Sequence, residues 1–574
     1  MPTTNPFAAV IMKYIKETSK ILCHGIDWVN CIGSECYVIQ NILDSAPAVE
    51  CYYSDIIYFT DNEYYFENSV RVTGNEKYIL QRSDHVHVYC IKNAKFPFSW
   101  FSPRWSGLKT GLRDVEVPYR PDRIDSLNVL VLGMDSISHN QFLRKLPHSY
   151  NVLTHELGAV ILNSYNILGD GTPAALFPIL TGKSELEMPD ARKINKGVYF
   201  HPKDFLFGQL KLDGYHTAYF EDMPQTGTFQ YRFNGFKYQP ADHYLRPLFL
   251  EATDLYCVGA VPRYALMLNL TLQFIKRAGK HFCFTFIADI CHDDSNLIAT
   301  MEDDLSEFLR ALKSNGILEN TLVFVMGDHG PRYSELRSIY QGKIEERLPF
   351  VGILLPEKVN NFIRAVKTSL RANADVLTTP FDIHTTILDA VGLSHLSNNY
   401  KVPGSDLPRG MSLLRPIPAT RSCAEADVHT HWCACLQWVN VSQTEPIYTR
   451  VANAFCTFIN NLVAVNAKCA KRELTAIEWV LREEHDNQYL NKDSGGGYLS
   501  IFRKSVEPSV ENYQVKVVMS PGHAIFEGTV MFLRNRDQFL VSEYDISRVN
   551  AYGDEPRCIV KTHPHLSKFC YCVV

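Results

Sequence analysis

Between residues 127 and 355 the sequence alternates short apolar segments with longer segments whose apolar residues recur at helical spacing. The apolar segments lie at 127–133, 160–168, 282–288, 321–326 and 348–355. A strand without polar alternation needs a cover on both faces, and helices supply that cover in mainly parallel sheets. This rhythm predicts an α/β fold with a mainly parallel sheet sandwiched by helices.

Three segments have apolar residues at helical spacing. Two lie between the apolar segments, at 266–278 and 297–314, and the third follows the last of them, at 359–372. Asn315 and Gly316 follow the segment at 297–314 where a helix should end, because both tolerate the left-handed conformation of many helix C-termini. Before the first strand, the prolines of segment 117–123 disfavour helix in the residues that precede them, which predicts a linker. We therefore place the α/β domain at 123–416.

Cysteine is concentrated in the two flanks of this domain. Of the 16 cysteines, five lie in the first 90 residues, eight lie beyond residue 422, and three lie between. Such flanks are typical of disulfide-stapled modules in secreted proteins. A zinc module is the alternative, but the late cysteines lack paired Cys-x2-Cys spacing, so we favour disulfides and leave their connectivity open. We expect an N-terminal cysteine-bearing region at 1–122, with a strand at 86–90, and a C-terminal cysteine-rich region at 417–574, with a glycine loop at 494–497.

Net charge and short sequence patterns indicate the cellular compartment of the protein and the classes of partner that it can bind. Lysine and arginine total 57 against 62 aspartate and glutamate, a net charge of −5, so nothing indicates a nucleic-acid partner. No apolar run reaches the ~20 residues of a transmembrane segment. Glycosylation sequons at Asn269 and Asn440 agree with secretion. The first 20 residues do not form a signal peptide pattern, so either the chain is cytosolic with many thiols or its N-terminus is incomplete. We expect the second, an extracellular or secretory-pathway chain. The oligomeric state stays open.

Polar side chains follow four of the predicted strands. Asp135 follows the first, and the motif Gly-Asp-Gly-Thr at 169–172 follows the second. Asp289 and His292 follow the third, and Gly-Asp-His-Gly at 327–330 follows the fourth. Active sites of open α/β sheets form outside the carboxyl ends of their strands. These residues are therefore candidates for a single site.

The same residue types suit metal-assisted chemistry. Asp135, Asp328 and His329 offer carboxylate oxygen and imidazole nitrogen, the usual ligands of zinc and manganese. Thr172 opens a helix whose free N–H groups favour an anion, and a hydroxyl beside a divalent cation can act as a covalent nucleophile. Each residue also has an ordinary interpretation, since Asp and Thr often cap helices and a lone His such as His292 is often structural. Their joint order favours the functional interpretation.

The motifs together resemble the sulfatase-like branch of the alkaline phosphatase superfamily and, within it, an animal extracellular family of unknown function. The resemblance is carried by Leu-Gly-Met-Asp-Ser-Ile-Ser at 132–138, Gly-Asp-Gly-Thr at 169–172, Leu-Thr-Gly at 180–182, His-Asp-Asp-Ser-Asn at 292–296, Gly-Asp-His-Gly-Pro-Arg at 327–332 and Gly-Lys-Ile-Glu-Glu-Arg-Leu-Pro at 342–349. The segments 519–527 and 570–572 fit the narrower family. The resemblance implies an alkaline-phosphatase/sulfatase-like fold in which 123–416 is the catalytic domain.

It also implies roles for individual residues. One metal site would consist of Asp135, Thr172, Asp328 and His329, with Thr172 as the nucleophile. The candidates for a second metal are Asp289, His292 and His384. In two-metal relatives the Asp and His are four residues apart, whereas here they are three apart, which argues against a second ion. His292 would then bind substrate or protonate the leaving group, and Arg332 would pair with phosphate oxygens. The charge run at 345–347 is interpreted as a solvated face.

Two departures from the family pattern bear on the reaction. Sulfatases need Cys or Ser within Cys-x-Pro-x-Arg, and here Thr172 is followed by Pro-Ala-Ala-Leu. We therefore expect a metal-dependent hydrolase or phosphotransferase acting on phosphodiesters or phosphomonoesters, lipid- or glycan-linked, rather than a glycan sulfatase. Relatives carry Asn before the nucleophile and Phe-Pro-Asn after it, whereas Gly171 and Pro-Ala-Ala at 173–175 stand here. Because a lost polar donor weakens transition-state binding, the alternative is a catalytically decayed extracellular binding protein.

Overall fold

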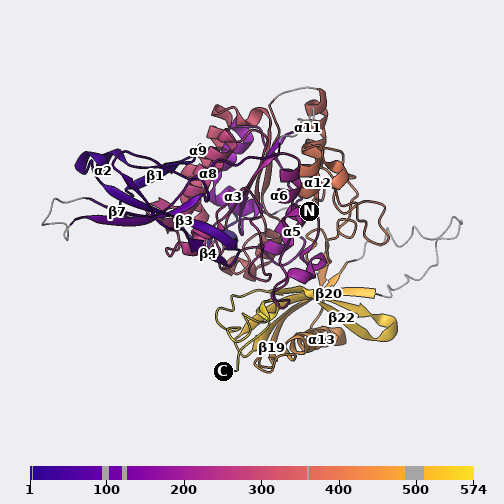
Figure 1. Cartoon of the computed structure of the whole chain (residues 1–574). Helices are drawn as coiled ribbons and strands as arrows, with labels where there is room; N and C mark the ends of the chain where they lie inside the picture. Colours follow the sequence, from indigo (N-terminus) through magenta and orange to yellow (C-terminus); the bar gives the residue numbers. More distant parts are fainter. Residues whose placement is uncertain (3, 93–101, 119–125, 358–360, 485–509, 574) are drawn as a thin grey trace.

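The computed structural model describes residues 1–574 except 3, 93–101, 119–125, 358–360, 485–509 and 574. Three regions follow one another along the chain (Figure 1): a β-rich N-terminal region, a large α/β domain, and a C-terminal region with its own five-stranded sheet. Most of the linker predicted at 117–123 and all of the glycine loop predicted at 494–497 lie outside the described residues.

A seven-stranded sheet forms the centre of the α/β domain. Its spatial order is β10-β17-β16-β9-β15-β11-β12, and the five strands from β16 to β12 are parallel. β17 runs antiparallel to β16, and β10 runs antiparallel to β17. The strands are β9 (Asn128–Met134), β10 (Val160–Ile161), β11 (His216–Glu221), β12 (His243–Tyr244), β15 (His281–Ile287), β16 (Thr321–Gly327) and β17 (Val351–Leu354). The predicted mainly parallel sheet is confirmed, with an antiparallel edge.

Alternate residues of β9 face two separate hydrophobic cores. Val129 and Val131 belong to one core, whereas Leu130 and Leu132 belong to the other. Neighbours along a strand point to opposite faces, so an unbroken apolar strand requires a cover on both. The first core is covered by α5 (Thr172–Thr181), α6 (Leu206–Leu212) and α12 (Pro380–Ala390), the second by α3 (His139–Lys145), α8 (Arg263–Arg277) and α9 (Glu302–Ser314). The predicted sandwich by helices is confirmed, in agreement with the alkaline-phosphatase/sulfatase-like fold that the motifs implied.

The strand predicted at 160–168 is largely wrong. Only Val160 and Ile161 form a strand, because the residues that follow make single backbone hydrogen bonds to the segment 374–378 instead of a continuous ladder. Asn166 also donates its side-chain amide to the carbonyl of Trp432, which ties this segment to the C-terminal region. Tyr165 nevertheless points into the core. Apolar character here reports burial rather than sheet pairing.

The other predicted elements are confirmed with shifted ends. The helix expected at 266–278 is α8, and the one expected at 297–314 is a 3-10 turn followed by α9. Gly316 has φ 71°, the left-handed conformation expected of a helix stop. The segment at 359–372 contributes α11 (Asn361–Asn373), and 348–355 contributes the antiparallel strand β17. Strands β11 and β12 are additions that the sequence pattern did not predict.

The N-terminal region is an antiparallel β module. β3 (Glu50–Thr60) pairs with β7 (His85–Ile91), which contains the strand predicted at 86–90, and β7 pairs with β8 (Arg104–Thr110). The disulfides Cys31–Cys36 and Cys51–Cys90 lie within this module. Cys23–Cys257 crosses to the α/β domain. The module is therefore covalently joined to the domain at a point remote in sequence.

The C-terminal region is an antiparallel sheet with one helix packed on it (Figure 1). Phe455 of the helix and Phe526 of the sheet share its core. Its elements are β18 (Trp438–Asn440), α13 (Pro446–Val463), β19 (Glu473–Glu483), β20 (Val510–Ser520), β21 (Ala524–Leu533) and β22 (Gln538–Arg548). The disulfides Cys469–Cys570 and Cys558–Cys572 staple the segment that follows β22.

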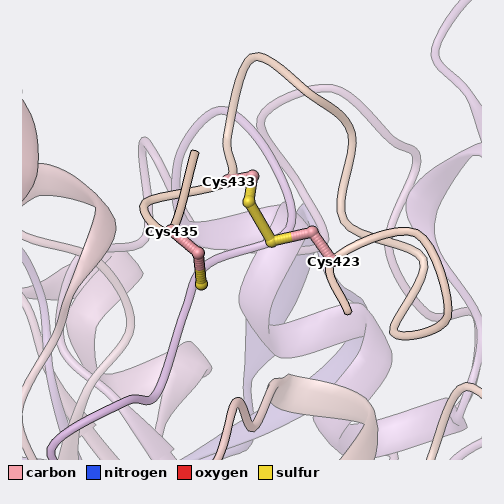
Figure 2. Close-up of side chains that lie close together, drawn as sticks. All are labelled: Cys423, Cys433 and Cys435. Carbon is pink, nitrogen blue, oxygen red and sulfur yellow. A yellow bond between two sulfur atoms is a disulfide. The ribbon is translucent and has the colours of Figure 1, made fainter. Parts of the chain in front are cut away.

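The preference for disulfides over zinc is confirmed. Six disulfides use 12 of the 16 cysteines, and the remaining thiols are Cys283, Cys291, Cys435 and Cys456. The Cys435 thiol lies beside the Cys423–Cys433 disulfide without being bonded to it (Figure 2). Two of these three sulfurs are oxidised, so the cluster does not offer the set of thiolates that structural zinc requires. None of the helices in the described part of the chain combines the length and hydropathy needed to cross a membrane.

Candidate metal centre and active site

Two neighbouring strands carry the predicted metal ligands at their carboxyl ends. β9 ends at Met134 and β16 ends at Gly327, and these two residues are partners in the parallel register. The residues that follow, Asp135 on one strand and Asp328 with His329 on the other, therefore meet at the same edge of the sheet. One ligand atom from each of the three lies within 4.8 Å of the other two. The structure thus brings these predicted ligands together.

The three side chains direct oxygen and nitrogen atoms that can bind a metal toward one another. His329 Nε2 lies 3.7 Å from an Asp135 oxygen and 3.4 Å from Asp328 Oδ2. His329 Nδ1 lies 2.9 Å from the carbonyl oxygen of Gly330, so the ring proton belongs on Nδ1 and Nε2 offers a lone pair. Asp328 Oδ2 and His329 Nε2 are buried without a hydrogen-bond partner. Because an unpaired buried carboxylate is costly without a cation, this donor set fits zinc or manganese.

Burial dominates the electrostatics of these ligands. It raises the pKa of Asp328 to about 6, although hydrogen bonds from the backbone N–H groups of Ser136 and His329 oppose the shift. It lowers the pKa of His329, and the positive charge of Arg332 adds to that effect. The imidazole is therefore kept neutral, the form that binds metal. A bound divalent cation would favour the Asp328 carboxylate and so reverse the first shift.

Thr172 begins α5 with its hydroxyl directed at the ligand cluster. Its Oγ1 donates to Asp135 Oδ2 at 3.2 Å. Gly171 holds the cap position with φ 82°, a conformation that residues with a side chain rarely adopt. Thr172 is thus the first residue of the helix and Gly171 its cap, which agrees with the ordinary interpretation of Thr172 as a cap or N-terminal helix residue. Its hydroxyl and the positive end of α5 lie beside the same ligands.

Arg332 lies against the backbone that precedes Thr172. A Cβ added to Gly171 would lie 2.8 Å from Arg332 Nη1. The same Nη1 donates to Asp170 Oδ1 at 2.8 Å, and the guanidinium sits over the Tyr333 ring, 5.0 Å from its centroid. Within the described residues, no second acceptor binds this guanidinium. Its remaining N–H groups are therefore open to a ligand.

A cavity of about 250 Å³ opens beside these residues, and Thr172, His292 and Arg332 all line it. His292 Nδ1 lies 2.7 Å from an Asp293 carboxylate oxygen. Burial disfavours the charged imidazole, but the hydrogen bond to Asp293 and the charge of Asp135 outweigh it and raise the pKa of His292. A proton donor near neutral pH thus faces the cavity that Thr172 lines.

Asp289 does not join the ligand cluster. It pairs with Asp222, the residue that follows β11, and burial together with this second carboxyl raises the pKa of Asp289 to about 10. The guanidinium of Arg263 lies 3.9 Å away. A protonated carboxyl at neutral pH is a poor metal ligand unless a cation displaces the proton. Both Asp289 oxygens are buried without a hydrogen-bond partner among the described residues, so Asp289 faces a second carboxyl where the resemblance gave it a metal.

His384 lies still farther from the cluster. Its Nδ1 is 2.9 Å from the carbonyl oxygen of Ile179, near the C-terminal end of α5. Ile179 is seven residues after Thr172, which is about 10 Å along a helix axis. Within the described residues, the Asp and His group able to hold an ion contains none of the three residues expected for a second metal. The structure does not bring Asp289, His292 and His384 together.

The interpretation of 345–347 as a solvated charge run is wrong. All three side chains are buried in α10 (Tyr340–Arg347). Glu345 accepts from Arg144, and Glu346 accepts from Arg337 at 2.6 Å. Arg347 binds the carbonyl of His431 and lies 3.4 Å from Glu527. The charges are buried because each has an opposite charge or a carbonyl in reach.

Two important residues near the site were not identified from the sequence. Asp222 accepts hydrogen bonds from the backbone N–H groups of Ala288 and Asp289. The rule used for the other strand ends would have found it, since the segment 216–221, whose centre at 218–220 is apolar, precedes it. Lys568 donates to Asp170 Oδ2 at 2.8 Å from 398 positions away. No local pattern signals that contact.

Comparison with known proteins gives a family and several remote likenesses. A lipoteichoic acid synthase from Listeria monocytogenes is 13% identical with a TM-score of 0.33, covering 58% of this chain and 82% of that chain. A protein in the alkaline phosphatase superfamily from Vibrio parahaemolyticus is 12% identical with a TM-score of 0.33, covering 79% and 87%. A putative sulfatase from Bacteroides fragilis is 10% identical with a TM-score of 0.36, covering 79% and 99%. No curated protein matches the sequence significantly.

The family comparison covers far more than half of the sequence. A family model described as "Protein of unknown function (DUF229)" matches residues 21–478, from the N-terminal module through the α/β domain and into the C-terminal region. The chain therefore belongs to this family.

Proposed function

We propose that the protein is a metal-dependent phosphoric ester hydrolase or transferase with Thr172 as its nucleophile. The observation that carries the proposal is the hydrogen bond from Thr172 to Asp135, at a cluster in which Asp328 Oδ2 and His329 Nε2 are buried without a hydrogen-bond partner in the described part of the chain. A hydroxyl, a set of metal ligands and a helix N-terminus then meet beside one cavity. A divalent cation held by Asp135, Asp328 and His329 would lower the pKa of a nearby hydroxyl and neutralise charge on a phosphoryl oxygen.

The chain's own groups supply the remaining steps. Thr172 Oγ1 forms a bond to phosphorus while the bond to the leaving oxygen breaks, and Asp135 accepts the hydroxyl proton. Arg332 binds the non-bridging oxygens. Protonated His292 gives its proton to the leaving oxygen. Water, or a second alcohol in a transferase, then gives its proton to the now neutral His292 and attacks phosphorus, and Asp135 returns its proton to the Thr172 oxygen as the bond from that oxygen to phosphorus breaks.

The proposal includes a substrate class and a setting. We propose a phosphodiester or phosphomonoester on a lipid or a glycan, acted on outside the cell or in the secretory pathway. Six disulfides support an oxidising compartment. Asn269 and Asn440 are both exposed, as glycosylation sites must be.

Replacement of Thr172 tests the enzyme. Zinc- or manganese-loaded wild type is expected to hydrolyse a generic aryl phosphodiester or monoester, and Thr172→Ala is expected to lose about a hundredfold or more of that rate. Thr457→Ala, on the exposed face of α13, is the matched control and should retain full activity. Equal background rates for wild type and Thr172→Ala across a broad ester panel would refute the enzyme.

A binding protein on a decayed enzyme fold is the second candidate. The observation behind it is the Pro-Ala-Ala sequence after Thr172, which supplies no polar side chain beside the nucleophile. It predicts bound metal, an intact fold and no turnover. A glycan sulfatase would require an aldehyde at the nucleophile, and an unmodified mass for the peptide that contains Thr172 would exclude it.

A further inference from the structure

The cavity beside Thr172 has two walls from different regions of the chain. The loop at 169–171 and Arg332 belong to the α/β domain. The facing residues come from beyond residue 540 and include Tyr544, Tyr552, His565, Lys568 and Phe569. A molecule in this cavity therefore touches both the α/β domain and the C-terminal region.

Buried polar contacts fix the C-terminal wall in place. Glu527 of β21 lies 2.7 Å from Lys343 Nζ and 3.0 Å from Arg337 Nη1, and all three side chains are buried. Trp432 of the same region donates its indole N–H to the carbonyl of Tyr544 at 2.9 Å, and its own carbonyl accepts from Asn166 of the α/β domain at 2.9 Å. Breaking a buried ion pair leaves an uncompensated charge. The wall is thus a fixed part of the cavity rather than a mobile flap.

Lys568 brings a second cation to the carboxylate that holds Arg332. Its Nζ donates to Asp170 Oδ2 at 2.8 Å and to the carbonyl of Ile546 at 2.7 Å. Asp170 Oδ1 accepts from Arg332. Two positive charges share one negative charge, so the trio carries a surplus positive charge two residues before Thr172. Among the described residues, the third Nζ proton and the rest of the guanidinium have no acceptor.

We propose that Lys568 is a substrate-binding residue, which with Arg332 forms a two-cation clamp on the phosphoryl group that Thr172 attacks. Asp170 is the positioning residue that holds both cations at the mouth of α5. The inference rests on the proposed function and deepens it, because it gives the C-terminal region a direct part in binding. An ammonium donating to a phosphate oxygen makes a charge-assisted hydrogen bond, the strong kind.

Inorganic phosphate is the probe. It is titrated by calorimetry into the full chain loaded with one equivalent of zinc. Lys568→Met is expected to weaken phosphate binding about tenfold, the size of one hydrogen bond to a charged group. Lys568→Arg should restore binding to within about threefold. Lys561→Met is the matched control, because Lys561 is exposed and does not line the cavity. Its phosphate affinity should equal that of wild type.

Lys568→Gln separates binding from a purely structural bridge. Its amide can still donate to Asp170 and to the Ile546 carbonyl, but it carries no charge. The clamp predicts weakening like that of Lys568→Met, and thermal unfolding checks that each variant is folded. If Lys568→Met does not fold, the phosphate affinities of Lys568→Gln and Lys568→Arg are compared with that of wild type instead.

Three results would overturn the clamp: wild-type phosphate affinity in Lys568→Gln, an equal loss in Lys561→Met, or no phosphate binding by wild type. The proposed function fails separately. If phosphate binding depends on Lys568 but no ester is turned over in a Thr172-dependent way, the clamp stands and the enzyme does not.

Discussion

His329 is held on both sides of its ring. Nδ1 is bonded to the Gly330 carbonyl, and Nε2 faces Asp135 and Asp328. A hydrogen bond to the far nitrogen fixes both the tautomer and the orientation of a metal-binding imidazole. As a proposed metal ligand His329 is therefore preorganised, and the buried carboxylate beside it would supply the charge that draws a cation to this point.

Removal of one ligand should remove the metal. Asp328→Asn and His329→Ala are expected to lower zinc affinity by about tenfold to a hundredfold or more, because each deletes a direct ligand of a three-residue set. Chelator competition and metal analysis after dialysis give the affinity and the stoichiometry.

Asp289→Asn is the matched control, since Asp289 pairs with Asp222 and lies outside the ligand group. We expect one zinc per chain in both wild type and Asp289→Asn. Two ions per wild-type chain, falling to one in Asp289→Asn, would contradict a single site.

Whole elements explain which site residues were predictable. β9 and β16 are central, parallel and apolar throughout, so the sequence marks where each ends and which acids and His follow. The same reasoning predicted too long a strand at β10, since apolar residues beyond Ile161 are buried without continuing the strand ladder.

The burial of the charged residues at 345–347 could not be predicted from the sequence for another reason. Arg347 meets Glu527 across 180 positions of sequence, and no local pattern encodes such a partner.

The start of α5 gives a prediction at this scale. Gly171→Ala is expected to lose stability, by about 1 kcal/mol for a side chain at positive φ, and to weaken phosphate binding, because the new Cβ would displace Arg332. Thermal unfolding and the phosphate titration measure the two effects.

Gly197→Ala is the matched control. Gly197 has φ 80°, close to the 82° of Gly171, but a Cβ there meets nothing within 4 Å. The strain should be similar while phosphate affinity stays at the wild-type value. Equal phosphate affinities in Gly171→Ala and Gly197→Ala would contradict this prediction. They would show that Arg332 does not need residue 171 to lack a side chain.

At the scale of the molecule, Glu527 joins the C-terminal region to the α/β domain. Arg337, Lys343 and Arg347 surround it. Burial would raise the pKa of Glu527, but these cations outweigh it and hold that pKa well below the ordinary value. Neither this junction nor the disulfide pairing could be predicted from the sequence, because both join segments that only the folded chain brings together.

Glu527→Gln should strongly destabilise the protein. Losing the carboxylate that all three cations share is expected to cost about 3–5 kcal/mol at pH 7, as for other broken buried pairs. A carboxylate with a depressed pKa stabilises the fold above its ordinary pKa, and the contribution is lost as pH falls through the folded value. The difference between wild type and variant should therefore shrink below about pH 4.5.

Urea unfolding at pH 7 and at pH 4 measures that difference. Asp537→Asn is the matched control, because Asp537 pairs with Arg450 on the exposed surface of the same region. Its effect should stay below about 1 kcal/mol. A loss for Glu527→Gln no larger than that of the control would refute the junction.

The late position of Lys568 affects the order in which the protein is made. The Asp170 loop and Lys568 are 398 positions apart, so at translation rates of about 5–20 residues per second they emerge roughly 20–80 s apart. During that interval the nascent chain already has the proposed nucleophile and the proposed metal ligands, but only one wall of its cavity. Completion of the proposed anion clamp would thus be a late event of biosynthesis, and any chaperone that binds the growing chain would meet that half-built cavity first.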